Sequence, residues 1–379
     1  MPRSTSRAAG RRGTGMTRSA QPQRQPASQE PKQQPAAESW KSGVHAYIKR
    51  FNQAEVDQHP SVFDDLIVDR DHLLRLGSRL ERLRERDLLR GVLSSRSETK
   101  AEIVRVNESA SETTVMLKLR IKRIMEQKSR SYTEERLEHE RLWLARDGRQ
   151  WIITRVEPVV SERRPRFGTT GQPPLSEESE LWTELSERIS RPPSAPFLNY
   201  DILPEIRHRA KQTYRRDLAA AYADRWWNEG NSAYELFEVN CTNYVSQCIF
   251  AGHAPMNYTG KRDNGWWYQG RNGGREMWSY SWAVANALQA YLASGRKSGL
   301  QGTIVESADQ LQLGDVILYD WNGDYRYQHS TIVTAFDVDG MPLVNANTVA
   351  SRHRYWDYQD SYAWTDKTRY RLFHIADQF

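Results

Sequence analysis

Residues 239–252 read VNCTNYVSQCIFAG, and this stretch decides how the second half of the chain is interpreted. Val245 and Ile249 lie four residues apart and Gly252 is a natural stop, so the spacing predicts a helix that begins near Cys241. A thiol in the first helical turn lies at the positive end of the helix dipole, beside backbone N–H groups without partners inside the helix. Both features favour the thiolate, and the N–H groups can stabilise an oxyanion. Cys241 is therefore a candidate nucleophile.

The chain has only two cysteines, Cys241 and Cys248. Seven residues of helix separate them by about 10 Å, beyond the ~7 Å Cα distance that a disulfide allows. Cys248 is therefore expected in the core. For Cys241, the alternative to a nucleophile is likewise an ordinary buried cysteine. Two cysteines cannot form a disulfide scaffold or a CxxC-type zinc site, and no HExxH spacing occurs, so neither a metal nor a cofactor is expected. Three further histidines, expected at the surface or in packing, are His253, His353 and His374.

A thiolate nucleophile needs a base, and the strand-like part of the chain that follows contains a candidate. Three runs with strand character span 313–319, 328–334 and 342–348. His329 opens the second run, and side-chain alternation lets Asn345 on its hairpin partner face the same side. Asn347 shares that facing and is a possible substitute for Asn345. The predicted catalytic triad is Cys241, His329 and Asn345, in which the asparagine orients the imidazole.

Composition excludes several classes of protein. The 379 residues include 54 basic and 48 acidic side chains, a formal net charge of +6, and the mean hydropathy is −0.80. No run approaches the ~20 apolar residues of a membrane-spanning helix. The first residues contain arginines but no apolar core of a signal peptide, so a cytoplasmic location is expected, with non-classical export left open.

The pattern of residues divides the chain into four parts. Residues 1–39 contain no Leu, Ile, Val or Phe and are typical of a disordered basic tail, within which Met16 is an alternative start. Residues 40–165 pass from helical spacing to period-two alternation and a hairpin signal at Asp147-Gly148, which predicts an α+β domain with helices on one face of an antiparallel sheet. This topology resembles the cystatin or NTF-two-like architecture. Residues 166–198 are predicted to be a linker with a short helix, and 199–379 a second domain.

The basic charge belongs to the first half of the chain. Residues 1–39 carry seven basic and two acidic side chains, and residues 40–170 carry 27 and 21, whereas residues 171–379 carry 20 and 25. An acidic second domain argues against nucleic acid as its partner. The basic first half instead favours docking or localisation, which makes a protein partner of the first domain a hypothesis.

An ordered series of motifs carries a family resemblance. The motifs are YADRWW at 222–227, CTNYVSQC at 241–248, GWWY at 265–268, GDV at 314–316, HS at 329–330 and LVN at 343–345. From about 199 to 376 the chain resembles the putative amidase domain family of Bacillus-type bacteria, which is similar to the NlpC-type cell-wall peptidases of the papain-like superfamily. The resemblance implies an α+β fold with the nucleophile helix packed on an antiparallel sheet. It also implies Cys241 as nucleophile, His329 as base and Asn345 as third residue.

Two positions depart from that family pattern. Asn240 ends Glu-Val-Asn where the family has Gly-Gly-Asp, and Asn347 stands where the family has histidine. The expected function is nevertheless a cysteine-dependent amidase that hydrolyses a peptide or cell-wall-type amide through a thioester. The alternative is a catalytically degenerate module that binds a peptide or glycan. Its cleft would be lined by Asn240, Trp266, Trp267 and Trp282, although the tryptophans can equally well be core residues.

Overall fold

The computed structural model describes residues 39–109, 111–148, 150–163, 212–272 and 275–379. The predicted basic tail, except Ser39, and the predicted linker with its short helix lie outside the described residues. The described residues all belong to one compact unit.

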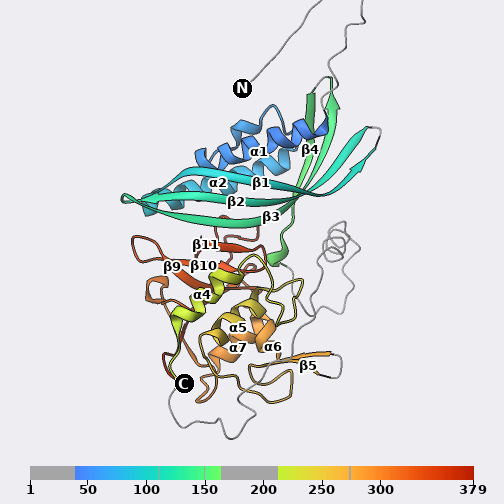
Figure 1. The fold of residues 1–379 in the computed structure, drawn as a ribbon. Coiled ribbons are helices and arrows are strands. Elements are labelled where there is room, and N and C mark those ends of the chain that lie inside the picture. Colours follow the sequence, from blue (N-terminus) through green and yellow to red (C-terminus); the bar gives the residue numbers. More distant parts are fainter. Residues whose placement is uncertain (1–38, 110, 149, 164–211, 273–274) are drawn as a thin grey trace, which may run out of the picture. The chain divides into compact units, whose positions relative to one another are not determined.

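Two helices cover one face of the first sheet (Figure 1). They are α1 (Trp40–Asp57) and α2 (Arg70–Arg90), joined through the short 3-10 helix η1 (Pro60–Phe63). Asp69 caps α2 by accepting the His72 N–H at 2.9 Å, and Gly91 ends it in the left-handed conformation, with φ of 60°. Apolar side chains on the inner faces of both helices pack against the strands in one hydrophobic core.

The first sheet is the predicted antiparallel meander. Its strands are β1 (Val92–Glu108), β2 (Glu112–Gln127), β3 (Arg130–Asp147) and β4 (Gln150–Pro158). The predicted alternation in β2 is confirmed, because Val115, Leu117, Leu119 and Ile121 are all fully buried. The hairpin at Asp147-Gly148 is also confirmed: Asp147 pairs with Gln150 across the turn between β3 and β4.

The second sheet is antiparallel and carries the candidate site. Its strands are β7 (Gly302–Val305), β8 (Val316–Asp320), β9 (His329–Phe336), β10 (Pro342–Ala346), β11 (Ser351–Tyr355) and β12 (Arg369–Ile375). They lie in the order β11-β10-β9-β8-β12-β7, while β5 (Tyr268–Asn272) and β6 (Arg275–Trp278) form a separate hairpin.

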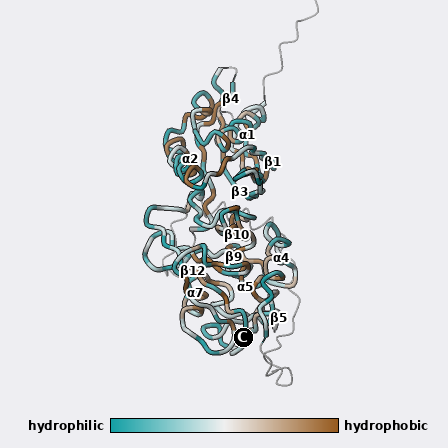
Figure 2. Tube along the Cα trace, turned by 90° about the vertical axis from the view of Figure 1, so that its left-hand side faces the viewer, coloured by the Kyte–Doolittle hydropathy of each residue, from teal (hydrophilic) through white to brown (hydrophobic). Residues whose placement is uncertain are grey.

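Helices cover one face of the second sheet. They are α4 (Arg216–Trp226), α5 (Cys241–Ala251), α6 (Tyr280–Ala283) and α7 (Ala285–Ala293). α4 and α5 pack on β9 and β10, and a tryptophan-rich core fills the space between helices and sheet. A second hydrophobic cluster, which includes Tyr319, Trp321 and Tyr358, covers the opposite face. Figure 2 shows hydrophobic stretches running through β9 and β10, the strands buried on both sides.

Strand pairing joins the two halves. In β11, Ser351 pairs with Arg136 and Arg352 with Glu135, both in β3, so the described strands other than β5 and β6 form one ten-stranded sheet. The mixture of helices and antiparallel sheet confirms the α+β class expected for both halves.

Candidate functional site

Cys241 is the first residue of α5, as the spacing predicts. Its side chain is 2% exposed, and its Sγ lies 3.8 Å from Thr242 Oγ1 and 4.0 Å from the carbonyl oxygen of Gln328. Its backbone N–H donates to Thr348 Oγ1 at 2.9 Å, and the N–H of Asn240 donates to the same oxygen at 2.8 Å. The thiol therefore lies at the N-terminus of a helix. The adjacent N–H groups already donate to Thr348, in the turn between β10 and β11.

The predicted base, His329, lies on the other face of the sheet from Cys241. Its ring centroid is 5.5 Å from that of Tyr319, 5.9 Å from that of Trp321 and 5.3 Å from that of Tyr358, all in the cluster opposite the helices. The next residue, Ser330, points the other way, with its Oγ 3.0 Å from Thr242 Oγ1 in α5. Neighbouring strand residues face opposite sides, so the imidazole of His329 points away from α5, although Cys241 Sγ lies 4.0 Å from the carbonyl oxygen of Gln328, the residue before His329.

The surroundings of His329 keep its imidazole neutral. Burial lowers the pKa of His329 to about 3, and the nearby Arg354 guanidinium acts in the same direction. Neither ring nitrogen has a hydrogen-bond partner among the described residues. A base for a thiol needs hydrogen-bond reach to it, and in this position the ring of His329 packs among aromatic side chains without such a hydrogen bond.

A bulge between β9 and β10 separates Asn345 from His329. Leu343 pairs with Ala335, but Val344 then pairs with Val333 and Asn345 with Ile332, which leaves one residue of β9 unpaired. A regular ladder would place Asn345 opposite Val333, on the same face as His329. One extra residue reverses the facing of everything beyond it. The expected shared facing of His329 and Asn345 is therefore wrong.

Asn345 instead contacts Asp224 and the backbone of a different histidine, on the helix side. Its Nδ2 donates to Asp224 Oδ1 at 2.8 Å, while its Oδ1 accepts the backbone N–H of His353 at 2.8 Å and the Thr334 hydroxyl at 2.8 Å. Asp224 Oδ1 also lies 3.1 Å from His353 Nε2. Burial raises the pKa of Asp224, but the hydrogen bonds from His353 and Asn345 outweigh it and lower the pKa overall. Sequence reasoning missed this cluster because its members come from three separate segments.

Asn240 and Asn347 contact each other beside the thiol. Asn240 Nδ2 donates to Asn347 Oδ1 at 2.7 Å, and Asn347 Nδ2 donates to the carbonyl oxygens of Trp226 at 2.9 Å and Trp227 at 2.8 Å. Asn347, the proposed substitute for Asn345, thus reaches the N-terminal end of α5 rather than His329. Both asparagines tie the β10–β11 connection to the segments around α4 and α5.

The tryptophans predicted as possible cleft residues are core residues. Trp266, Trp267 and Trp282 are all fully buried. Their indole N–H groups donate to Ser246 Oγ at 3.0 Å, the carbonyl oxygen of Asn264 at 2.9 Å and Asn243 Oδ1 at 2.8 Å, respectively. Side chains buried and satisfied in this way cannot line an open cleft, which corrects that expectation and leaves the core interpretation.

Cys248 is buried as expected, and burial raises the pKa of its thiol well above the usual value. Among the described residues, no group of three or more His, Cys, Asp or Glu side chains is placed to hold a metal ion. None of the described helices has the length and hydropathy needed to cross a bilayer.

The helix, the thiol and most of the second sheet lie within the residues that match a family model. Residues 213–373 match the family described as "putative amidase domain". A relative in Bacillus subtilis (strain 168), the uncharacterized protein YhbB, is 50% identical over 183 residues, which cover 48% of this chain and 57% of YhbB. The chain thus spans little more than half of that relative. For the second domain, the family match suggests amide hydrolysis.

One solved structure overlaps the chain weakly. The intermembrane space region of the chloroplast protein ARC6 aligns with 33% of this chain and 97% of its own, at 15% identity and a TM-score of 0.25. A likeness this weak supports no conclusion about fold or function.

Proposed function

We propose that the second domain hydrolyses an amide bond, of a peptide or cell-wall type, with Cys241 as the nucleophile. The observation that carries this proposal is the position of the thiol at the first residue of α5, within the residues that match the amidase family. The helix N-terminus favours negative charge, both on the attacking sulfur and on the carbonyl oxygen that becomes an oxyanion. An NlpC-like relationship of the fold belongs to the same proposal.

The chemistry proceeds in two balanced steps. The Cys241 thiolate attacks the amide carbonyl carbon, the C–N bond breaks, and the amine leaves with a proton while a thioester forms. Water then attacks the thioester, releasing the carboxylic acid and restoring the thiol. The family resemblance assigns the proton transfers to His329 and the orientation of its ring to Asn345. Two observations argue against those roles. The ring of His329 packs on the face of the sheet opposite the helices, and the side chain of Asn345 contacts Asp224.

A second candidate is a domain of amidase ancestry that binds its amide ligand without turnover. The position of His329 favours it, since a thiol without a base within reach is a poor amidase nucleophile. Asn347 adds support, because the family has a histidine at this position and the asparagine side chain is held by backbone carbonyls.

Hydrolysis by the full chain separates the candidates. Aminoacyl p-nitroanilides and short cell-wall-type peptides serve as substrates, with Cys241→Ala as test and Cys248→Ala as the matched thiol control. We expect Cys241→Ala to lower kcat/KM by more than about a thousandfold, as loss of a nucleophile does, and Cys248→Ala to leave it within a few-fold. A wild type as inactive as Cys241→Ala, yet binding the same peptides in calorimetry, would establish the second candidate.

His329→Phe tests the base within the same experiment. Phenylalanine keeps the aromatic packing against Tyr319, Trp321 and Tyr358 but has no proton acceptor. Hydrolysis that survives this change makes His329 a packing residue. Hydrolysis lost together with an intact fold would restore it as the base and require a strand arrangement other than the one described.

A further inference from the structure

The turn between β10 and β11 contacts the nucleophile helix on one side and the first domain on the other. On the helix side, Thr348 Oγ1 accepts the N–H groups of Asn240 and Cys241 at 2.8 and 2.9 Å. The Asn240 side chain makes no capping bond to its own helix. The hydroxyl of Thr348, 4% exposed, therefore satisfies two donors that the start of α5 would otherwise leave open.

These two donors are those that an oxyanion at Cys241 would need. An amide carbonyl attacked by a cysteine at a helix start places its oxygen within about 3 Å of the adjacent backbone N–H groups. Thr348 Oγ1 already lies at that distance from both. A substrate carbonyl oxygen and the Thr348 hydroxyl thus compete for one position.

The first domain holds this turn in place. Leu137 in β3 donates its N–H to the carbonyl oxygen of Ala350 at 2.7 Å, and Ser351 pairs with Arg136 directly after the turn. Directly before these anchors, Val349 adopts a φ of 46°, a conformation that a β-branched residue takes only when its surroundings impose it. The position of Thr348 therefore depends on β3 as well as on the second domain.

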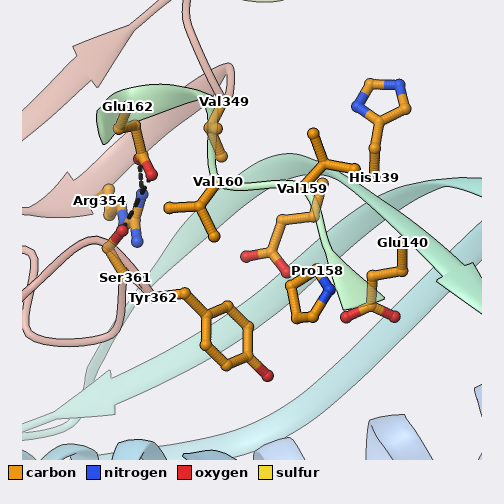
Figure 3. Close-up of a pocket in the computed structure, with 11 residues that line it drawn as sticks. His139, Glu140, Pro158, Val159, Val160, Glu162, Val349, Arg354, Ser361 and Tyr362 are labelled. Carbon is orange, nitrogen blue, oxygen red and sulfur yellow. Dashed lines mark hydrogen bonds and ion pairs between the residues drawn. The ribbon is translucent and has the colours of Figure 1, made fainter. Parts of the chain in front are cut away.

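The far side of the turn borders free space. The Val349 side chain lines a cavity of about 20 Å³ together with residues of β3, the segment after β4 and the segment after β11, among them Glu140, Val160 and Tyr362 (Figure 3). Such a volume holds about one water molecule. The turn thus has room for a small displacement away from α5 and toward the first domain.

We infer that Thr348 occupies the carbonyl-oxygen site of Cys241, and that the first domain controls access to this site through the β3–β11 pairing. The basic first domain then regulates the second in cis. The effect on catalysis rests on the proposed function, in which Cys241 is the nucleophile. The competition between the Thr348 hydroxyl and a carbonyl oxygen for the two N–H groups does not depend on turnover.

Alkylation of Cys241 by iodoacetamide, followed by mass spectrometry of the intact chain, tests the inference. Removing the hydroxyl in Thr348→Ala should accelerate alkylation by at least roughly threefold, because the hydroxyl accepts two N–H groups and one neutral hydrogen bond alone corresponds to about three- to tenfold. Thr348→Ser keeps the acceptor and should react like wild type, as should Thr303→Ala, an exposed threonine on β7. A folded Thr348→Ala protein that reacts no faster than wild type would overturn the inference and leave Thr348 as a helix cap.

Hydrogen exchange on the wild type gives a readout that needs no variant. If the turn moves locally, the amide of Cys241 exchanges faster than that of Ile332 in the middle of β9, which opens only with the sheet. Equal exchange of the two amides would contradict the inference. Failure of the proposed function would give a different result. Amide hydrolysis would then be unaffected by Cys241→Ala, whatever the alkylation rates are.

Discussion

At the scale of single residues, burial changes the protonation state of some side chains. From the sequence alone, these groups would be expected to have their usual charge. Glu140 in β3 is fully buried and accepts the Tyr47 hydroxyl at 2.6 Å. Burial raises its pKa to about 7, although the hydrogen bond from Tyr47 acts in the opposite direction. Glu140 thus stays protonated in the folded chain at pH values where an exposed glutamate is charged.

Glu140→Gln should remove one source of pH dependence in stability. A glutamate pKa raised from 4.5 to about 7 on folding stabilises the native state below pH 4.5, and this contribution disappears as pH rises to about 7. We expect the free energy of unfolding of wild type, relative to Glu140→Gln, to fall by up to about 3 kcal/mol between pH 5 and 8. Urea unfolding at several pH values measures it. The exposed Glu126→Gln is the control, and a difference independent of pH would disprove the assignment.

At the scale of elements, turns and bulges decide which side chains meet. The bulge between β9 and β10 directs Asn345 toward Asp224 and leaves His329 among aromatic rings. Ahead of β8, Gly314 takes a φ of 79°, and its carbonyl oxygen accepts the hydroxyl of Tyr214 at 2.9 Å. A Cβ at Gly314 would lie 2.6 Å from that hydroxyl oxygen.

Two glycine substitutions separate backbone strain from crowding. Gly340, in the β9–β10 turn, has nearly the same φ of 80°, but a Cβ added there would have no neighbouring atom within 4 Å. Gly340→Ala should cost about 1–2 kcal/mol for the left-handed backbone alone. Gly314→Ala should cost a further ~1–3 kcal/mol, because Tyr214 must move. Denaturant unfolding measures the loss in free energy of unfolding for each variant. Equal losses would show that the Tyr214 side chain moves aside at no cost.

At the scale of the whole described unit, a buried charge network joins the two halves. Asp360, in the segment after β11, accepts Arg136 of β3 at 2.9 Å and Arg354 of β11 at 3.0 Å, and its carbonyl oxygen accepts Arg79 of α2 at 2.6 Å. Burial raises the pKa of Asp360, but the arginines around it, led by Arg354 and Arg136, lower it far more. The first domain therefore uses part of its surface, around Arg79 and Arg136, to contact the second domain of the same chain.

Asp360→Asn should destabilise both halves at once. It leaves Arg136 and Arg354 buried with one carboxylate fewer, a loss that typically costs about 3–5 kcal/mol. Because the sheet is continuous, we expect one cooperative transition at a lower denaturant midpoint. Arg225→Ala, which breaks the exposed pair with Glu229, should cost less than about 1 kcal/mol. Two separate transitions in the Asp360 variant would refute the coupling.

Local signals in the sequence determined much of the fold. The spacing of Val245 and Ile249 predicts α5 with Cys241 at its start, and alternation predicts β2, because such elements depend on neighbours a few residues apart. The tertiary structure decided what those elements bring together. A single unpaired residue reversed the facing of Asn345, pairing of β11 with β3 set Thr348 over Cys241, and packing buried Trp266. Each depends on contacts between segments distant in sequence, and side-chain facing has a period of only two residues, so a one-residue shift in register is enough to change the site.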